Sequence, residues 1–131
     1  MSGEITFTQC VAVAIGAGAG ALARWASGLA FNALWAGFPL GTLLVNCLGG
    51  LLIGVAMVWF QRSPHEVWRL FIVTGFLGGF TTFSSFSAES LGLMQRGDVG
   101  MAAAHTLAHV LGALTFTAAG FALARLALQR I

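Results

Sequence analysis

The segment Thr74–Ser87, with the sequence TGFLGGFTTFSSFS, holds the side chains of this chain that are best suited to meeting an ion. It places six hydroxyl groups and four phenylalanines within an apolar stretch. Phe83 and Phe86 are three residues apart, so on a helix they share one face. The edge of each aromatic ring is slightly positive and can meet an anion without a full charge. We therefore predict that this segment lines a polar path.

The same segment predicts an interrupted helix. Gly78 and Gly79 weaken helical structure because glycine loses more conformational freedom than other residues when it is fixed. Backbone groups that an interruption releases in lipid need partners, and hydroxyl side chains can supply them. The hydroxyls that follow the glycines are those of Thr81, Thr82, Ser84, Ser85 and Ser87. We expect a broken helix here.

The composition indicates which solvent surrounds this segment. Of the 131 residues, 58% are hydrophobic and 8% are charged, which leaves too little polar surface to cover a protein in water. A spanning helix needs about 20 mostly apolar residues. The sequence predicts four spans, at about 7–29, 41–60, 70–94 and 100–128. The expected fold is an all-α integral membrane protein with four transmembrane helices, forming a single membrane domain over residues 1–131.

Short connections between the spans predict antiparallel neighbours.

Glycines four residues apart make a smooth stripe that lets a neighbouring backbone approach closely. Three spans carry such pairs, at Gly16 and Gly20, Gly50 and Gly54, and Gly75 and Gly79. Four thin, tightly packed helices hardly enclose a pore. We therefore expect any conduit to lie at a subunit interface of a homo-oligomer, most often a dimer.

Three polar side chains are expected inside the spans, where ionisable and amide groups are costly and often functional. Arg24 lies toward the end of the first span and either reaches the interface beside Trp25 or draws anions to the protein. Asn46 lies within the second span and can donate to an anion or to a neighbouring helix. Glu89 is either a proton carrier or a partner for a local hydroxyl or arginine.

The fourth span carries a polar stripe with one gap. His105, His109, Ala113 and Thr117 are spaced by four, so they share one helical face. Two histidines at this spacing can bind a metal, but no Cys, Asp or Glu on the same helix completes a site. We favour a line of hydrogen-bonding groups that faces the third helix, and packed core histidines are the alternative.

Three motifs together resemble one known family. They are ALARW at Ala21–Trp25, GTLLVN at Gly41–Asn46 and TGFLGGFTTFSSFSAE at Thr74–Glu89. In this order and over the whole chain they resemble the Fluc family of fluoride channels, also called the CrcB family. The resemblance implies a fluoride-selective channel of the bacterial plasma or inner membrane, built as an antiparallel dual-topology homodimer with two pores. Such a channel lets microbes lose accumulated fluoride passively.

The resemblance also implies roles for particular residues. Four of them match pore positions of the family: Arg24, Asn46, Phe83 and Phe86. Backbone carbonyls of Gly78 and Thr81 would hold one structural sodium ion at the centre of the dimer. The further residues expected along the fluoride path are Ser84, Ser85, His109 and Thr117.

Two features depart from the family pattern. Ala113 stands where relatives often carry serine, which leaves roughly 12 Å of helix rise between His109 and Thr117. Water or the hydroxyls of Ser84 and Ser85 would have to bridge that interval. With the N-terminus inside, the basic residues give a mild bias toward one orientation, since Arg62, Arg69, Arg125 and Arg130 would lie inside, against Arg96 and Arg24 outside. Antiparallel assembly is therefore implied by the resemblance and not by the charges.

The main alternative is a small four-helix secondary transporter of the multidrug exporter kind. That class has a similar length and hydropathy, but it relies on a membrane-embedded glutamate in its first helix, and the first span here has none. A cofactor-anchoring subunit of a larger complex would instead need histidines on facing helices. The sequence holds no motif typical of an enzyme.

Overall fold

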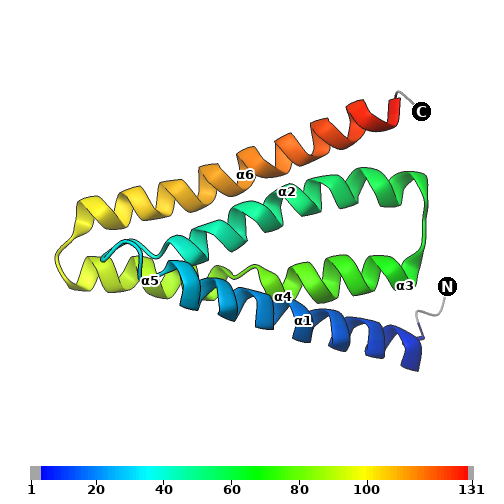
Figure 1. Ribbon diagram of the computed structural model, residues 1–131, viewed down its shortest axis with the longest axis horizontal. Coiled ribbons are helices and arrows are strands. Elements are labelled where there is room, and N and C mark those ends of the chain that lie inside the picture. The colour runs from blue at the N-terminus through cyan, green and yellow to red at the C-terminus, as the bar shows by residue number, and fades with distance from the viewer. Residues whose placement is uncertain (1–3, 130–131) are drawn as a thin grey trace.

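The structure, a computed structural model, describes residues 4–129 of the chain. Within this range it is all-helical, and four helical segments are long and apolar enough to cross a membrane. They are α1 (Phe7–Phe31), α2 (Leu40–Arg62), the composite segment Glu66–Gln95, and α6 (Val99–Gln129). These segments confirm the prediction of four apolar helices (Figure 1).

The composite third segment changes its helical geometry along its length. Its parts are α3 (Glu66–Arg69), the π-helix η1 (Leu70–Leu77), α4 (Gly78–Phe80) and α5 (Phe83–Gln95). Between α4 and α5, Thr81 has φ −86° and ψ 160° and Thr82 has φ −152° and ψ 121°, so both residues are extended. The Thr82 side chain accepts a hydrogen bond from the Ser85 N–H and thereby caps the start of α5.

Close backbone contact joins α1 to the third segment. A Cβ atom added at Gly16 would overlap the carbonyl of Phe71, and one added at Gly79 would overlap the carbonyl of Ala17. Because neither position has room for a side chain, α1 can approach η1 and α4 closely along its whole glycine stripe. The glycine spacing in the sequence correctly predicted this kind of packing.

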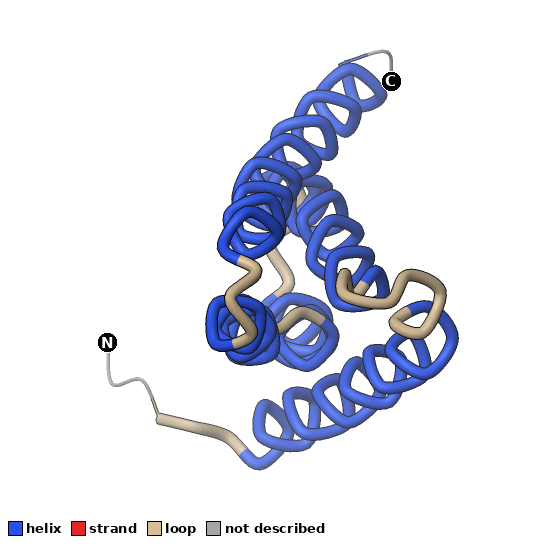
Figure 2. Tube along the Cα trace, turned by 90° about the vertical axis from the view of Figure 1, so that its left-hand side faces the viewer, coloured by secondary structure: helices blue, strands red, loops and turns tan. Residues whose placement is uncertain are grey.

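A second glycine contact joins α2 to α6. A Cβ atom at Gly54 would overlap the carbonyl of Thr117, and one at Gly120 would overlap the carbonyl of Leu51. These two helices form the most extensive contact in the structure. The α1 and α6 helices lie on opposite sides of the bundle, as Figure 2 shows in the view along its length.

Both chain ends lie at one end of the bundle (Figure 1). Arg62 ends α2 at this end, where its guanidinium donates to the carbonyl of Leu128 over 2.8 Å. Arg69 and Arg125 lie toward the same end, and Arg96 follows α5 at the other. Arg130 lies outside the described residues.

Candidate functional site

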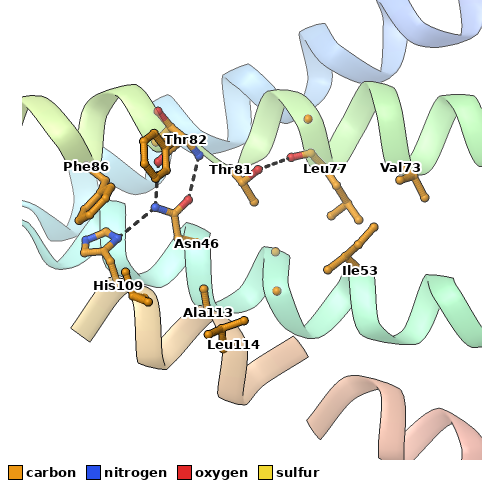
Figure 3. A pocket seen from close by; sticks show the side chains of 15 residues that line it. Asn46, Ile53, Val73, Leu77, Thr81, Thr82, Phe86, His109, Ala113 and Leu114 are labelled. Carbon is orange, nitrogen blue, oxygen red and sulfur yellow. Dashed lines mark hydrogen bonds between the residues drawn. The ribbon is translucent and has the colours of Figure 1, made fainter. Parts of the chain in front are cut away.

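An open groove of about 570 Å³ lies between α2, the third segment and α6 (Figure 3). Apolar side chains form most of its wall, and among residues 4–129 no charged residue lines it. Its polar or aromatic lining residues are Asn46, Thr81, Thr82, Phe83, Phe86 and His109, and Gly78 also borders it. The groove therefore brings together six positions that the sequence analysis expected at functional sites, five on the third segment or α6 and one on α2.

Asn46 holds the extended backbone at Thr82. Its Oδ1 accepts from the Thr82 N–H over 2.8 Å, and its Nδ2 donates to the Thr82 carbonyl over 2.9 Å. An extended residue inside a membrane segment has both backbone groups free of the helical pattern, so each needs a partner in lipid. The amide of Asn46 has one acceptor and one donor group and satisfies both at once.

The amide of Asn46 also contacts α6. Asn46 Nδ2 lies 3.1 Å from Nδ1 of His109, and the His109 ring packs on Phe86 with 4.7 Å between ring centroids. Phe86 in turn meets Phe83 edge to face, at 5.3 Å and 66°. A continuous set of polar and aromatic groups thus runs from α2 through α6 to α5.

The two phenylalanines differ in burial. Phe86 is 8% exposed and is packed between Phe83 and the two histidines of α6, whereas Phe83 is 78% exposed. Within one subunit, therefore, Phe86 has a fixed surrounding and Phe83 projects from the surface. Both rings border the groove.

The interruption also leaves two carbonyls without their usual helical donors. In an α-helix the carbonyl of Gly78 would accept from the N–H of Thr82, and that of Thr81 from Ser85. Here the Thr82 N–H is directed to Asn46 and the Ser85 N–H to the Thr82 hydroxyl. Neutral carbonyl oxygens free of helical partners are ligands that suit a hard cation.

A second cavity, of about 350 Å³, lies on the other side of Thr82. Arg24, Thr42, Ser85 and Glu89 line it, and Thr82 borders both this cavity and the groove. The Nε of Arg24 donates to the carbonyl of Gly79 over 2.9 Å, which places the guanidinium charge beside the interruption. Arg24 and Ser85 are thus separated from the Asn46 groove by the Thr82 backbone.

A hydrogen-bonded cluster joins α2, α5 and α6 near this cavity. Glu89 accepts from the Thr42 hydroxyl over 2.6 Å, and its other oxygen lies 3.2 Å from Nε2 of His105. His105 is fully buried, and its Nδ1 lies 2.8 Å from the hydroxyl of Ser90. Glu89, His105 and His109 each offer one ligand atom within 4.8 Å of the others, the arrangement of a possible metal site.

Sequence reasoning did not find this cluster as a unit. Glu89 lies on the third span, and the helix that carries the two histidines holds no acidic residue. The one signal for this cluster in the sequence is that the third span carries adjacent polar residues, Glu89 and Ser90, and the fourth span carries a polar stripe. Pairing them requires the register between α5 and α6, which tertiary packing sets.

Two further expected pathway residues, besides Arg24 and Ser85, lie away from the groove. Ser84 is exposed, and its hydroxyl lies 3.4 Å from that of Thr82. The Thr117 hydroxyl donates to the carbonyl of Ala113 in its own helix over 2.8 Å, beside Gly50 of α2. Among the described residues, neither side chain lines the groove.

A comparison of the sequence with known proteins identifies the family of this chain. Residues 11–121 match the family model described as CrcB-like protein, Camphor Resistance (CrcB). The chain belongs to the CrcB family. Since residues 11–121 run from α1 into α6, the match covers both the groove and the second cavity.

Curated relatives of this CrcB chain carry the name fluoride-specific ion channel FluC. The relative from Tolumonas auensis is 49% identical over 114 residues, which cover 86% of this chain and 90% of the relative. The one from Pectobacterium atrosepticum is 46% identical over 119 residues, or 89% and 94% of the two chains. A Pseudomonas aeruginosa relative is 49% identical over 112 residues, or 84% and 88%. With its four apolar helices, this CrcB chain is a multi-pass bacterial membrane protein.

Proposed function

We propose that this chain is a fluoride-selective channel that lets fluoride leave the cell passively and so confers fluoride resistance. The observation that carries the proposal is the groove beside Thr82, where the Asn46 amide and the Phe86 and His109 rings meet at an extended break in a membrane segment. Near full-length relatives named fluoride-specific ion channels support the same conclusion.

The chemistry of the groove suits a small, strongly hydrated anion. A pore for fluoride has to replace the water around the ion with donors, and it has to release the ion again. Hydroxyl and imidazole groups and the positive edges of aromatic rings can do the first without a full charge, while the Asn46 amide positions them through its bonds to Thr82 and His109. Because no charged residue lines the groove, an anion there is bound weakly enough to pass.

Arg24 has a separate role in this proposal. Its guanidinium lies beside the second cavity, where its positive charge attracts anions, while the carboxylate of Glu89 in the same cavity is engaged by Thr42 and His105. Ser85 offers a hydroxyl in the same cavity, and Thr82 separates it from the groove. We propose that fluoride gathers at Arg24 and then passes Thr82 to reach Asn46, Phe86 and His109. Ser84 and Thr117 would contribute to the path where a second subunit or water brings them into reach.

We further propose that the working form is an antiparallel dual-topology homodimer. The exposure of Phe83, at 78%, supports this, because an aromatic ring beside a groove with polar groups gains a partner when a second copy covers it. Gly78 is also exposed at the interruption. Polar groups that open onto lipid are costly, and a second subunit would remove them from it.

A labelling experiment distinguishes dual from single topology. A cysteine at the exposed Gly97 turn, in a background without Cys10 and Cys47, can be treated with a membrane-impermeant maleimide in sealed, right-side-out vesicles. Dual topology predicts that about half of the chains react before the vesicles are opened, since each orientation is equally populated. Complete labelling, or none, would show one orientation and reject the antiparallel dimer.

The carbonyls of Gly78 and Thr81 would hold a structural sodium ion between the subunits. Their usual helical donors are engaged elsewhere, so a two-fold dimer would supply neutral oxygen ligands from both copies. The ion would fix the two interrupted segments against one another. Replacing sodium by a bulky organic cation should then weaken the dimer on a sizing column; an unchanged dimer with no retained sodium would rule the site out.

Purified protein in liposomes tests the function itself. Vesicles loaded with fluoride should lose it rapidly once a potassium ionophore removes the charge imbalance, and vesicles loaded with chloride should not. The alternative of a secondary transporter predicts that efflux depends on a proton gradient instead. The first helix, α1, holds no acidic residue, whereas that class relies on a glutamate there.

A further inference from the structure

One buried ring nitrogen, Nε2 of His109, has no hydrogen-bond partner among the described residues. The His109 side chain is 4% exposed and is packed against the rings of Phe86 and His105, at centroid distances of 4.7 and 4.5 Å. Buried polar groups are nearly always paired, and an unpaired one in a native protein calls for an explanation. The nature of the missing partner depends on whether Nε2 carries a proton.

The amide of Asn46 settles that question. The backbone of Thr82 fixes the orientation of this amide, because Oδ1 faces the Thr82 N–H and Nδ2 faces the Thr82 carbonyl. Turning the amide over would set donor against donor and acceptor against acceptor at both contacts. The group that faces Nδ1 of His109, at 3.1 Å, is therefore the NH₂, which can only donate (Figure 3).

The consequence for His109 follows directly. Nδ1 must accept the hydrogen bond from Asn46 and so carries no proton, and a neutral imidazole then carries its proton on Nε2. We propose that Asn46 is a positioning residue that holds His109 in the Nε2–H tautomer, so that His109 offers a buried N–H donor to a small anion. For this channel that anion is fluoride, so the inference rests on the proposed function and names one of its ligands.

The same geometry argues against a metal ion at this position. Glu89, His105 and His109 have the ligand types and proximity of a metal site, but a metal needs the lone pair of an unprotonated nitrogen. Coordination through Nε2 would move the proton of His109 to Nδ1, where it would face the Asn46 NH₂. Relieving that conflict would turn the amide and break both of its hydrogen bonds to Thr82.

A neutral imidazole donor also suits conduction. Fluoride can only accept hydrogen bonds, so a single N–H aimed at it gives a favourable contact. The donor carries no net charge, and the ion can therefore leave again. The ring of His109 cannot turn freely to offer its other nitrogen, because Phe86 and His105 pack against it and Asn46 holds Nδ1.

Nitrogen NMR of the intact protein in lipid nanodiscs tests the tautomer without reference to transport. With ¹⁵N-labelled histidine, the chain gives signals from three residues, His65, His105 and His109, and the His109→Phe variant assigns the last. We expect Nε2 of His109 to be of the protonated type and Nδ1 of the unprotonated type. A proton on Nδ1, or two tautomers in exchange, would overturn the positioning role of Asn46.

A variant of nearly identical shape gives the converse test. In Asn46→Asp, at a pH at which the new carboxyl group is ionised, the oxygen that faces Nδ1 can only accept, so the proton should move to Nδ1. The matched control is Asn32→Asp, because Asn32 accepts from the Thr42 N–H and has no contact with His109. An Asn46→Asp protein that keeps the Nε2–H form would overturn the inference, and so would a change in the control.

Fluoride titration tests the donor role. Adding fluoride, but not chloride, should shift the Nε2 resonance of His109, and His109→Phe should slow fluoride efflux by about tenfold or more, the effect of one lost hydrogen bond to a charged ligand. If the protein conducts fluoride but the Nε2 resonance does not shift on adding fluoride, or shifts on adding zinc instead, the donor role is overturned. Absence of fluoride efflux from a protein with the expected tautomer would overturn the proposed function alone.

Discussion

Removing the amide of Asn46 should destabilise the break in the third segment more than any comparable loss of one polar side chain. Asn46→Leu keeps the branching of the side chain and leaves no cavity, so the expected cost comes mainly from lost hydrogen bonds. The N–H and the carbonyl of Thr82 would both lose their partner. Each half-buried backbone group left unpaired costs about 1–3 kcal/mol, so the expected loss in unfolding free energy is about 2–6 kcal/mol.

Two measurements check this expectation. Reversible unfolding in mixed detergent micelles gives the change in free energy, and hydrogen exchange gives the local opening at Thr82. Asn32→Leu is the control, because Asn32 makes one such bond, from the Thr42 N–H at 3.2 Å, and should cost about 1 kcal/mol. The reasoning is refuted if Asn46→Leu is no less stable than Asn32→Leu and the Thr82 amide exchanges at the wild-type rate.

Three further predictions concern the rings and the glycines. Phe83→Ile should leave the stability of a subunit nearly unchanged, since the ring is 78% exposed, but should abolish fluoride efflux; normal efflux would remove Phe83 from the path. Phe86→Ile should abolish efflux and also lower the unfolding free energy by about 1–2 kcal/mol, because the ring contacts to Phe83 and both histidines are lost. Unchanged stability would contradict that packing. Gly79→Ala should destabilise the subunit by about 1–3 kcal/mol, because the new methyl group would overlap Ala17. Gly78→Ala should leave the stability nearly unchanged, because the atom nearest to its new methyl group would lie 3.8 Å away. Equal melting temperatures for the two variants would count against close packing of α1 on α4.

Local sequence patterns predicted much of the fold because each depends on one segment at a time. Runs of apolar residues gave the four membrane helices, and the glycine pairs predicted close helix contacts, which Gly16 and Gly79 make between α1 and the third segment. The glycines and hydroxyls of Thr74–Ser87 indicated where the helical pattern would change. The π-helix η1 was not predicted, because no residue type in Leu70–Leu77 specifies that geometry.

The sequence indicated several residues of the groove one by one, but not their arrangement. Asn46, Phe86 and His109 were each expected to be functional, and the structure brings them together in one groove. The bonds from Asn46 to the Thr82 backbone join segments 36 residues apart, so no spacing rule reveals them. Glu89 and His105 likewise meet only through the register of α5 on α6. The hydroxyl of Thr117 was expected in the path, but it is bonded to its own helix.

Current through single channels in a planar lipid bilayer tests the central claim most directly. With fluoride on one side and chloride on the other, and with no proton gradient, the account predicts a steady current whose reversal potential follows the fluoride gradient. In this account the Nε2–H of His109, beside the ring of Phe86, would be the neutral donor for such a passive flow. A reversal potential that shows equal passage of chloride, or the absence of any current from protein that moves fluoride only with protons, would contradict it.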